Sequence, residues 1–130
     1  MEKQLLNHFV IKAKLPSLND YTDACRSGKH SGANLKKDTE QLICAYIRIS
    51  KTLHPVNTPV EVHFEWHEGD RRRDVDNIIF AKKYILDSMQ KCKIIPNDSR
   101  RYVKQCYDKV YDDTDTFVVV SLIEAGDCDE

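Results

Sequence analysis

The sequence predicts one α/β (α+β) domain, in which a mixed sheet of about four strands is covered by two main helices. The chain has 130 residues, a length that fits a single domain. Short segments of alternating apolar and polar residues predict strands, and longer segments with apolar residues at helical spacing predict helices. The resulting order is β-α-β-α-β-β, which favours one sheet packed against the helices.

The first half of the chain supplies two strands and one helix. Residues 7–14 are predicted to form the first strand, and residues 15–21 a loop, because the loop contains a proline and an Asn-Asp pair. Residues 34–53 place their apolar side chains close to one stripe at helical spacing, which predicts a helix. Residues 60–66 alternate cleanly between apolar and polar, the pattern of a half-buried strand.

A polar turn over residues 67–73 leads into the second predicted helix. This helix covers residues 77–93, which are rich in Ile, Leu, Ala and Lys. It is expected to end before residues 95–98, Ile-Pro-Asn-Asp, which have the composition of a turn.

The C-terminal part is predicted to form a hairpin. Its strands are residues 101–111 and 116–123, and residues 112–115 supply the turn. The domain is therefore assigned to residues 1–123. Residues 124–130 are predicted to be an acidic, disordered tail, whose charge we expect to temper non-specific DNA binding.

The charge is unevenly distributed along the chain. The net charge is −1, but all 20 Lys and Arg residues lie at or before Lys109, beside 14 acidic residues, a formal charge of +6. Residues 111–130 carry seven acidic and no basic residues. This asymmetry is compatible with a basic face for nucleic acid beside an acidic end, and equally with an ordinary solvated surface.

Composition also limits the compartment. The longest apolar run falls short of the 18 residues that a membrane span requires, and the N-terminus does not resemble a secretory signal. The number of cysteines is odd and no pair has C-x-x-C spacing, which predicts free thiols in a reducing cytoplasm. The five cysteines are Cys25, Cys44, Cys92, Cys106 and Cys128.

Two acidic residues lie between the turn after the second predicted strand and the second predicted helix, and a third follows that helix. Asp74 and Asp76 are two residues apart, so in an extended chain their side chains project to the same side. Asp98 follows the predicted helix, which is about 24 Å long, and therefore lies at the end of the helix far from the aspartate pair. Only a return of the chain in the next strand could bring Asp98 near them. Carboxylates are the natural ligands of Mg²⁺, which makes the three aspartates a candidate metal site. Helix capping and turn formation are the alternative interpretation.

Basic residues adjoin these acids. Arg71, Arg72 and Arg73 directly precede the aspartate pair, where they can bind phosphate, pair with the acids or stay solvated. Lys82 falls inside the apolar stripe of the predicted helix, and Lys83 lies nearly on the helix face of the second aspartate. Either ammonium group is a candidate to stabilise charge on a phosphate, although Lys82 can also extend its amine into water.

Four segments together carry a family resemblance. They are Leu15 to Tyr21, Arg72-Arg73-Asp74-Val75-Asp76-Asn77, Lys83 to Met89, and Asn97-Asp98. With this set the chain resembles the RusA family of Holliday junction resolvases, over about residues 8–123. It looks closest to the phage and prophage branch.

The resemblance implies a homodimeric, Mg²⁺-dependent endonuclease, with Mn²⁺ as a possible substitute, that makes paired symmetric nicks in four-way DNA junctions. It implies a bacterial cytoplasmic enzyme of recombination or repair. Asp74, Asp76 and Asp98 would be its three essential aspartates. The family's lysine follows the D-x-D-N asparagine by three residues, where this chain has Phe80. The later K-x-x-x-D pattern gives Lys83 instead, and Lys82 stays open. The DNA-binding residues are assigned to Arg71, Arg72, Arg73, Arg100 and Arg101.

Two other functions are left open by the sequence. One is a non-catalytic, junction-binding accessory protein of a phage, which would bind branched DNA without cutting it. The other is a broader nuclease for flaps and branched DNA.

Overall fold

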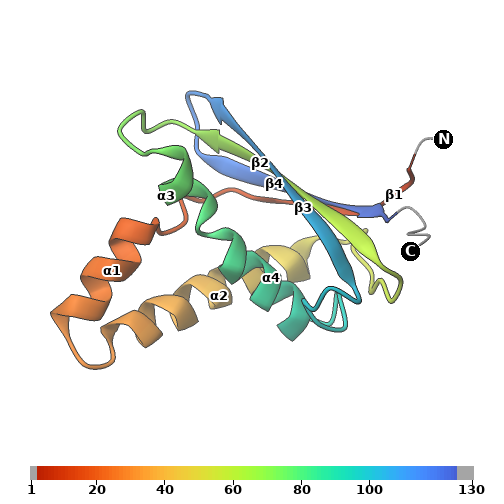
Figure 1. Cartoon of the computed structure of the whole chain (residues 1–130), viewed down its shortest axis with the longest axis horizontal. Coiled ribbons are helices and arrows are strands. Elements are labelled where there is room, and N and C mark those ends of the chain that lie inside the picture. Colours follow the sequence, from red (N-terminus) through yellow and green to blue (C-terminus); the bar gives the residue numbers. More distant parts are fainter. Residues whose placement is uncertain (1–2, 126–130) are drawn as a thin grey trace.

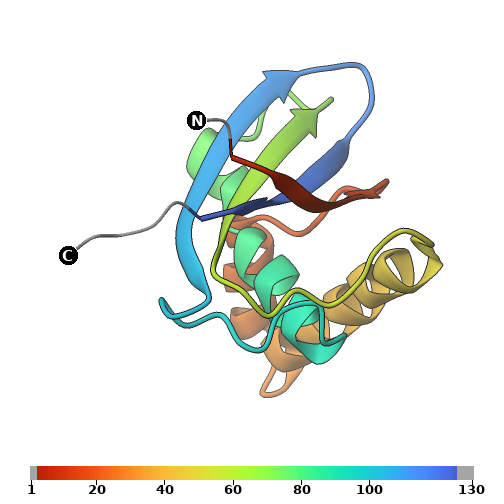
Figure 2. The same cartoon turned by 90° about the vertical axis from the view of Figure 1, so that its right-hand side faces the viewer.

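In the computed structural model, which describes residues 3–125, four strands form one mixed sheet in the order β1-β4-β2-β3 (Figure 1). β4 is antiparallel to both β1 and β2, and β2 is parallel to β3. The helices lie on one side of the sheet (Figures 1 and 2). The predicted α+β class and the mixed sheet are confirmed. The strands are β1 (Leu5–Ile11), β2 (Val60–Glu68), β3 (Val103–Asp112) and β4 (Phe117–Glu124).

The predicted hairpin between the last two strands is wrong, because β2 lies between β3 and β4. Phe64 in the middle of β2 is opposite Asp108 of β3 on one side and Val120 of β4 on the other. The polar residues 113–116 therefore carry the chain across the end of β2 rather than through a tight turn. Side-chain alternation indicates which face of a strand is buried, but it does not identify the neighbouring strand.

The first helix, α1 (Leu18–Ser27), begins within residues 15–21, which the sequence predicted to form a loop. Ser17 caps it: its hydroxyl accepts the Asp20 N–H at 3.1 Å, and the Asp20 carboxylate accepts the Ser17 N–H at 2.9 Å. This reciprocal pair is a capping box. None of the residues of α1 is buried. The next helix, α2 (Ser31–Ile49), corresponds to the predicted helix 34–53.

The second predicted helix is divided into α3 (Val75–Ile79) and α4 (Lys82–Lys91). Around Phe80 and Ala81 the chain uses i→i−3 hydrogen bonds, from Ala81 N–H to Ile78 O at 3.3 Å and from Lys83 N–H to Phe80 O at 3.3 Å. Such tightened turns change the direction of side chains relative to a continuous helix. The two candidate aspartates, Asp74 and Asp76, lie before this break, and the two candidate lysines, Lys82 and Lys83, lie after it.

The core lies between the helices and the facing side of the sheet. Trp66 and Phe64 of β2 are stacked with their ring centroids 5.5 Å apart and are almost completely buried. Buried Glu40 of α2 is paired with Lys91, which fastens α4 to α2. The other large buried side chains include Phe9, Ile11, Val62, Val120 and Leu122 of the sheet and Ile43, Ile47, Tyr84, Ile85 and Met89 of the helices.

Several other predictions concern the surface and the ends. Four of the five cysteines are free thiols, as predicted: Cys25, Cys44, Cys92 and Cys106. Cys128 lies outside the described residues.

Glu124, the first residue of the predicted tail, ends β4 and donates its N–H to Gln4 O at 2.8 Å. The remaining tail, from residue 126 on, lies outside the described part of the chain. Between residues 3 and 125, none of the helices has the length and apolar character needed to cross a membrane.

Candidate active site

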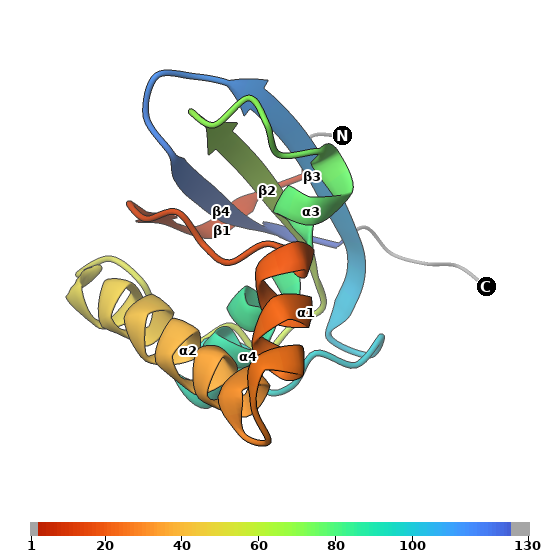
Figure 3. The ribbon, with the colours of Figure 1, turned by 90° about the vertical axis from the view of Figure 1, so that its left-hand side faces the viewer.

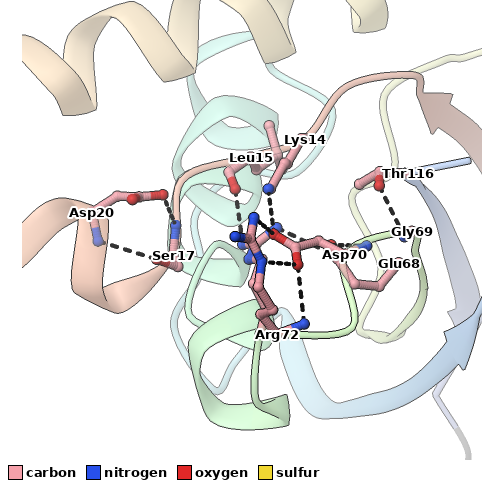
Figure 4. Close-up of polar contacts among 10 residues, drawn as sticks. Lys14, Leu15, Ser17, Asp20, Glu68, Gly69, Asp70, Arg72 and Thr116 are labelled. Carbon is pink, nitrogen blue, oxygen red and sulfur yellow. Dashed lines mark hydrogen bonds and ion pairs between the residues drawn. The ribbon is translucent and has the colours of Figure 1, made fainter.

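The turn that leads from β2 to α3 is held in place by Asp70 (Figure 4). Its carboxylate accepts hydrogen bonds from Lys14 Nζ at 2.9 Å, from the Arg72 N–H at 3.0 Å and from Arg72 Nε at 3.1 Å. The Asp70 N–H in turn donates to Glu68 Oε2 at 3.1 Å. These bonds, first from Arg72 and then from Lys14, hold the pKa of Asp70 well below its usual range. The turn is thus tied both to β2 and to the segment after β1.

Arg73 is the buried member of the arginine run. Its Nη1 donates to Glu68 Oε1 at 3.0 Å, and its Nη2 donates to the Leu15 carbonyl at 3.0 Å. The side chains of Arg73 and Glu68 are only 11% and 5% exposed. This guanidinium therefore serves the fold and does not face a ligand outside the protein.

The other predicted DNA-binding arginines lie on the surface. Arg72 is 90% exposed even though it pairs with Asp70, and Arg71 beside it is exposed as well. Arg100 and Arg101 are exposed on the segment before β3, where the Arg101 guanidinium lies 5.4 Å from the centre of the Tyr102 ring. Their exposure lets all four side chains approach phosphate groups, Arg72 while it remains paired with Asp70.

Asp74 and Asp76 lie at the start of α3 with both carboxylates exposed. Asp74 occupies the N-cap position, but its side chain makes no capping hydrogen bond. Asp76 Oδ1 accepts only the N–H of Asn77, at 3.0 Å. Within residues 3–125 neither carboxylate forms an ion pair. Helix capping by Asp74, the alternative interpretation, does not account for its side chain.

Asn77 connects the aspartate segment to the N-terminal part of the chain. Its Oδ1 accepts the Asn19 N–H at 3.2 Å, across 58 positions of sequence. α1 and α3 therefore lie next to each other (Figure 3). Tyr21 of α1 adds a ring contact with Phe80, 5.6 Å between centroids. These contacts join the segment from Leu15 to Tyr21 with α3 and the residue that follows it, and so bring together two of the segments in which the family resemblance was found.

A shallow hollow of about 420 Å³ gathers three of the predicted catalytic residues. Asp76 lines it on the α3 side, and Lys82 and Lys83 line it at the start of α4. Lys83 Nζ lies 3.2 Å from Asp98 Oδ2 and 3.2 Å from Asp87 Oδ1. Asp98 is thereby brought to a lysine that shares the hollow with Asp76. The remaining lining residues are apolar or weakly polar: Ile79, Phe80, Leu86 and Cys106.

The two lysines differ in their surroundings. Lys82 Nζ lies 2.6 Å from Asp108 Oδ2, and its side chain is 26% exposed, against 62% for Lys83. Hydrogen bonds to Asp98 and then to Asp87 raise the pKa of Lys83, which keeps it cationic at neutral pH. The position of Lys82 in the apolar stripe of the predicted helix is thus explained by a carboxylate partner.

The donor atoms near the hollow suit a hard divalent cation. Mg²⁺ needs only one or two protein carboxylates and keeps several waters, and Asp74 and Asp76 offer exposed, unpaired carboxylates. Burial raises the pKa of the Cys106 thiol, so this possible soft ligand stays neutral. Among the described residues, however, there is no group of three or more His, Cys, Asp or Glu side chains placed to hold one ion. A shared site for Asp74, Asp76 and Asp98 stays a prediction.

Sequence reasoning missed Asp108, which contacts one of the candidate lysines. A signal was available, because Asp108 lies two residues from Cys106 and two from Val110, and all three are partly buried while Tyr107 and Lys109 are exposed. Period-two alternation thus puts an acid among the residues that face the helices.

The sequence matches no family model and no curated protein. The likeness to the RusA family therefore depends on the motif residues quoted above. The functional interpretation depends on those residues and on their geometry.

Proposed function

We propose that this chain is a Mg²⁺-dependent endodeoxyribonuclease that cuts branched DNA, with the four-way Holliday junction as its substrate. The observation that carries the proposal is the common location of the candidate residues. Asp76, Lys82 and Lys83 line one hollow, and Lys83 binds Asp98. Acidic metal ligands beside fixed cations are the groups that hydrolysis of a phosphodiester requires.

Asp74 and Asp76 are the proposed metal ligands. Both carboxylates are exposed, so a phosphate and its metal can reach them without rearrangement of the core. When bound, the ion supplies Lewis-acid stabilisation of the phosphate and lowers the pKa of the attacking water. Two of the neighbouring arginines have other partners, since Arg72 pairs with Asp70 and Arg73 pairs with Glu68.

The lysines are proposed to stabilise the negative charge that builds on the phosphate oxygens. Two carboxylate neighbours, first Asp98 and then Asp87, raise the pKa of Lys83 and so favour its cationic form further. Asp98 would act in the same site, either as a third metal ligand or by fixing Lys83. Fixed charges that are already in place before the reaction stabilise a transition state more than mobile ones.

Exposed arginines supply the proposed DNA-binding surface. Arg71 and Arg72 precede the aspartates, and Arg100 and Arg101 follow Asp98. These guanidinium groups would fix DNA by its phosphates. A homodimer would present two such sites to a two-fold symmetric junction and so produce paired nicks. The free thiols agree with the proposed setting, the cytoplasm of a bacterium that carries a phage or prophage.

Cleavage of a labelled synthetic four-way junction tests the proposal, with flap and linear duplex DNA as controls. Each substrate is incubated with Mg²⁺, with Mn²⁺ and with EDTA. Symmetric nicks on the junction alone, and only with a divalent metal, are the expected result. Equal cutting of flaps would extend the function to branched DNA in general. Tight junction binding without cutting under any metal would contradict the proposal and favour a non-catalytic accessory protein.

A further inference from the structure

The ion pair between Lys82 and Asp108 spans two elements beside the proposed active site. Lys82 is the first residue of α4, and Asp108 lies in the middle of the edge strand β3. Their charged atoms, Nζ and Oδ2, are 2.6 Å apart. The pair is largely withdrawn from solvent, with the two side chains 26% and 17% exposed. Solvent therefore screens this contact less than it screens the other lysine contacts at the hollow.

Asp108 is itself held from the other side. Its second oxygen, Oδ1, accepts the indole N–H of Trp66 at 2.9 Å. Trp66 is 2% exposed and is stacked on Phe64, and Lys82 Nζ lies 5.8 Å from the centre of the Phe64 ring. The carboxylate is thus fixed by a core residue, and the ammonium is fixed by the carboxylate and by an aromatic face.

From these contacts we propose that Asp108 is a positioning residue that directs the Lys82 ammonium to the reacting phosphate, an inference that rests on the proposed nuclease function. An ammonium has three N–H donors. Asp108 accepts from one, and Lys82 lines the hollow that Asp76 also lines. The other donors are available to phosphate oxygens. Lysine has a long flexible stem, so anchoring by a fixed carboxylate determines where its charge lies.

This assignment divides the work between the two adjacent lysines. Lys83 is 62% exposed, and its partners Asp87 and Asp98 belong to α4 and to the segment that follows it. Lys82 is connected instead to the sheet, through Asp108 and Trp66. Lys82 is therefore the lysine held toward the phosphate, and Lys83 is the residue that holds Asp98.

A purely structural ion pair, joining α4 to β3, makes a different prediction. It would lower stability when broken, but the folded variant would cut DNA at the normal rate. A positioning role makes the effects of the two residues non-additive, because Asp108 acts only through Lys82. The experiment therefore asks whether the change at Asp108 slows cleavage only when Lys82 is present. A purely structural ion pair predicts no such slowing in the folded variant.

The test measures single-turnover cleavage of a four-way junction with Mg²⁺, at saturating protein, together with junction affinity and thermal unfolding. The variants are Asp108→Asn, Lys82→Gln, the double variant and Trp66→Phe. The last change removes the N–H that holds Asp108 together with part of a buried ring, so its thermal unfolding is measured beside its cleavage rate. Asp113→Asn is the matched control, since Asp113 accepts from His67 Nδ1 at 3.0 Å at the end of β3. Its cleavage rate is expected to stay normal.

We expect Asp108→Asn to slow cleavage about 10- to 100-fold with little change in affinity, the scale on which misplacement of a reacting group acts. In the Lys82→Gln background the same change should cost no more than about twofold. Trp66→Phe should slow cleavage less than Asp108→Asn and still detectably, which keeps the test decisive if Asp108→Asn does not fold. Normal cleavage by folded Asp108→Asn and Trp66→Phe, or equal losses in both backgrounds, would overturn the positioning role alone. A wild-type chain that cuts no branched DNA under any divalent metal would overturn the proposed function, and this inference with it.

Discussion

The ammonium of Lys83 lies 3.2 Å from the carboxylate of Asp98, although α4 runs away from Lys83 for most of the sequence between them. The chain returns because Lys93 adopts a left-handed conformation, with φ of 61°. Hydrogen bonds from Ile94 N–H to Met89 O at 2.8 Å and from Lys93 N–H to Gln90 O at 3.1 Å complete a Schellman motif. The turn thus places Asp98 near the candidate site.

Lys93→Gly is expected to stabilise the protein by about 1 kcal/mol, because glycine adopts the left-handed conformation without the cost that a side chain adds. Urea unfolding measures the difference. Gln90→Gly, at an exposed position inside α4, is the matched control and should destabilise by about 1 kcal/mol. A loss of stability in Lys93→Gly would contradict the account of this turn.

Arg73→Ala should destabilise the protein by about 3–5 kcal/mol, because it leaves the Glu68 carboxylate buried without its cation. Arg72→Ala, one position earlier, removes an exposed guanidinium and should cost much less stability. It should instead weaken DNA binding and reduce its dependence on salt. Equilibrium unfolding and a salt titration of junction affinity separate the two effects. Equal loss of stability in both variants would contradict the structural role of the pair between Arg73 and Glu68.

Asp70 should make stability depend on pH in the acidic range. Its folded pKa is depressed, chiefly by Arg72 and then by Lys14, so its contribution is fully present above the unfolded pKa of about 3.9 and is lost as pH falls toward the folded pKa. The Tm difference between wild type and Asp70→Asn should therefore be constant from about pH 5 to 7 and shrink below about pH 4. A Tm difference between wild type and Asp70→Asn that grows as the pH falls would contradict a depressed pKa of Asp70 in the folded protein.

The cysteines should differ in reactivity. Burial, and then the hydrogen bond with Cys44, raises the pKa of Cys92 to about 11, whereas Cys25 is exposed. Because the thiolate is the reactive form, iodoacetamide at pH 8 should modify Cys25 rapidly and Cys92 slowly. Mass spectrometry of peptides over time measures both rates. Fast modification of Cys92 in the folded protein would contradict its placement between α2 and the end of α4.

Much of the local structure could be predicted from periodicity. The alternation in residues 60–66 identified β2, and the apolar stripe in residues 34–53 identified α2. The pairing of β3 with β2 could not be predicted, because alternation specifies a face and the neighbouring strand comes from distant parts of the chain. α1 was missed because the proline and the Asn-Asp pair in residues 15–21 indicated a loop, although Ser17 and Asp20 form a recognisable capping box.

The candidate site was predicted in part. The sequence predicted an extended segment for Asp74 and Asp76 before a helix that begins at residue 77, whereas the structure has Asp74 at the N-cap and Asp76 inside α3, so the helix begins two residues earlier. The return of Asp98 depends on a left-handed lysine at position 93, which sequence rules assign to glycine or asparagine. Asp108 was missed because its partner Lys82 is 26 positions away, and only the folded sheet brings them together.

The central claim, that Asp74 and Asp76 carry metal-dependent cleavage, is tested most directly by a Mg²⁺ titration of single-turnover junction cleavage. Wild type is compared with Asp74→Asn, Asp76→Asn and the control Asp38→Asn, an exposed aspartate on α2. The account predicts saturable Mg²⁺ dependence in wild type and control, and a loss of at least about 100-fold in both site variants with junction binding retained. Cleavage by wild type in EDTA, or normal cleavage by either site variant, would contradict it.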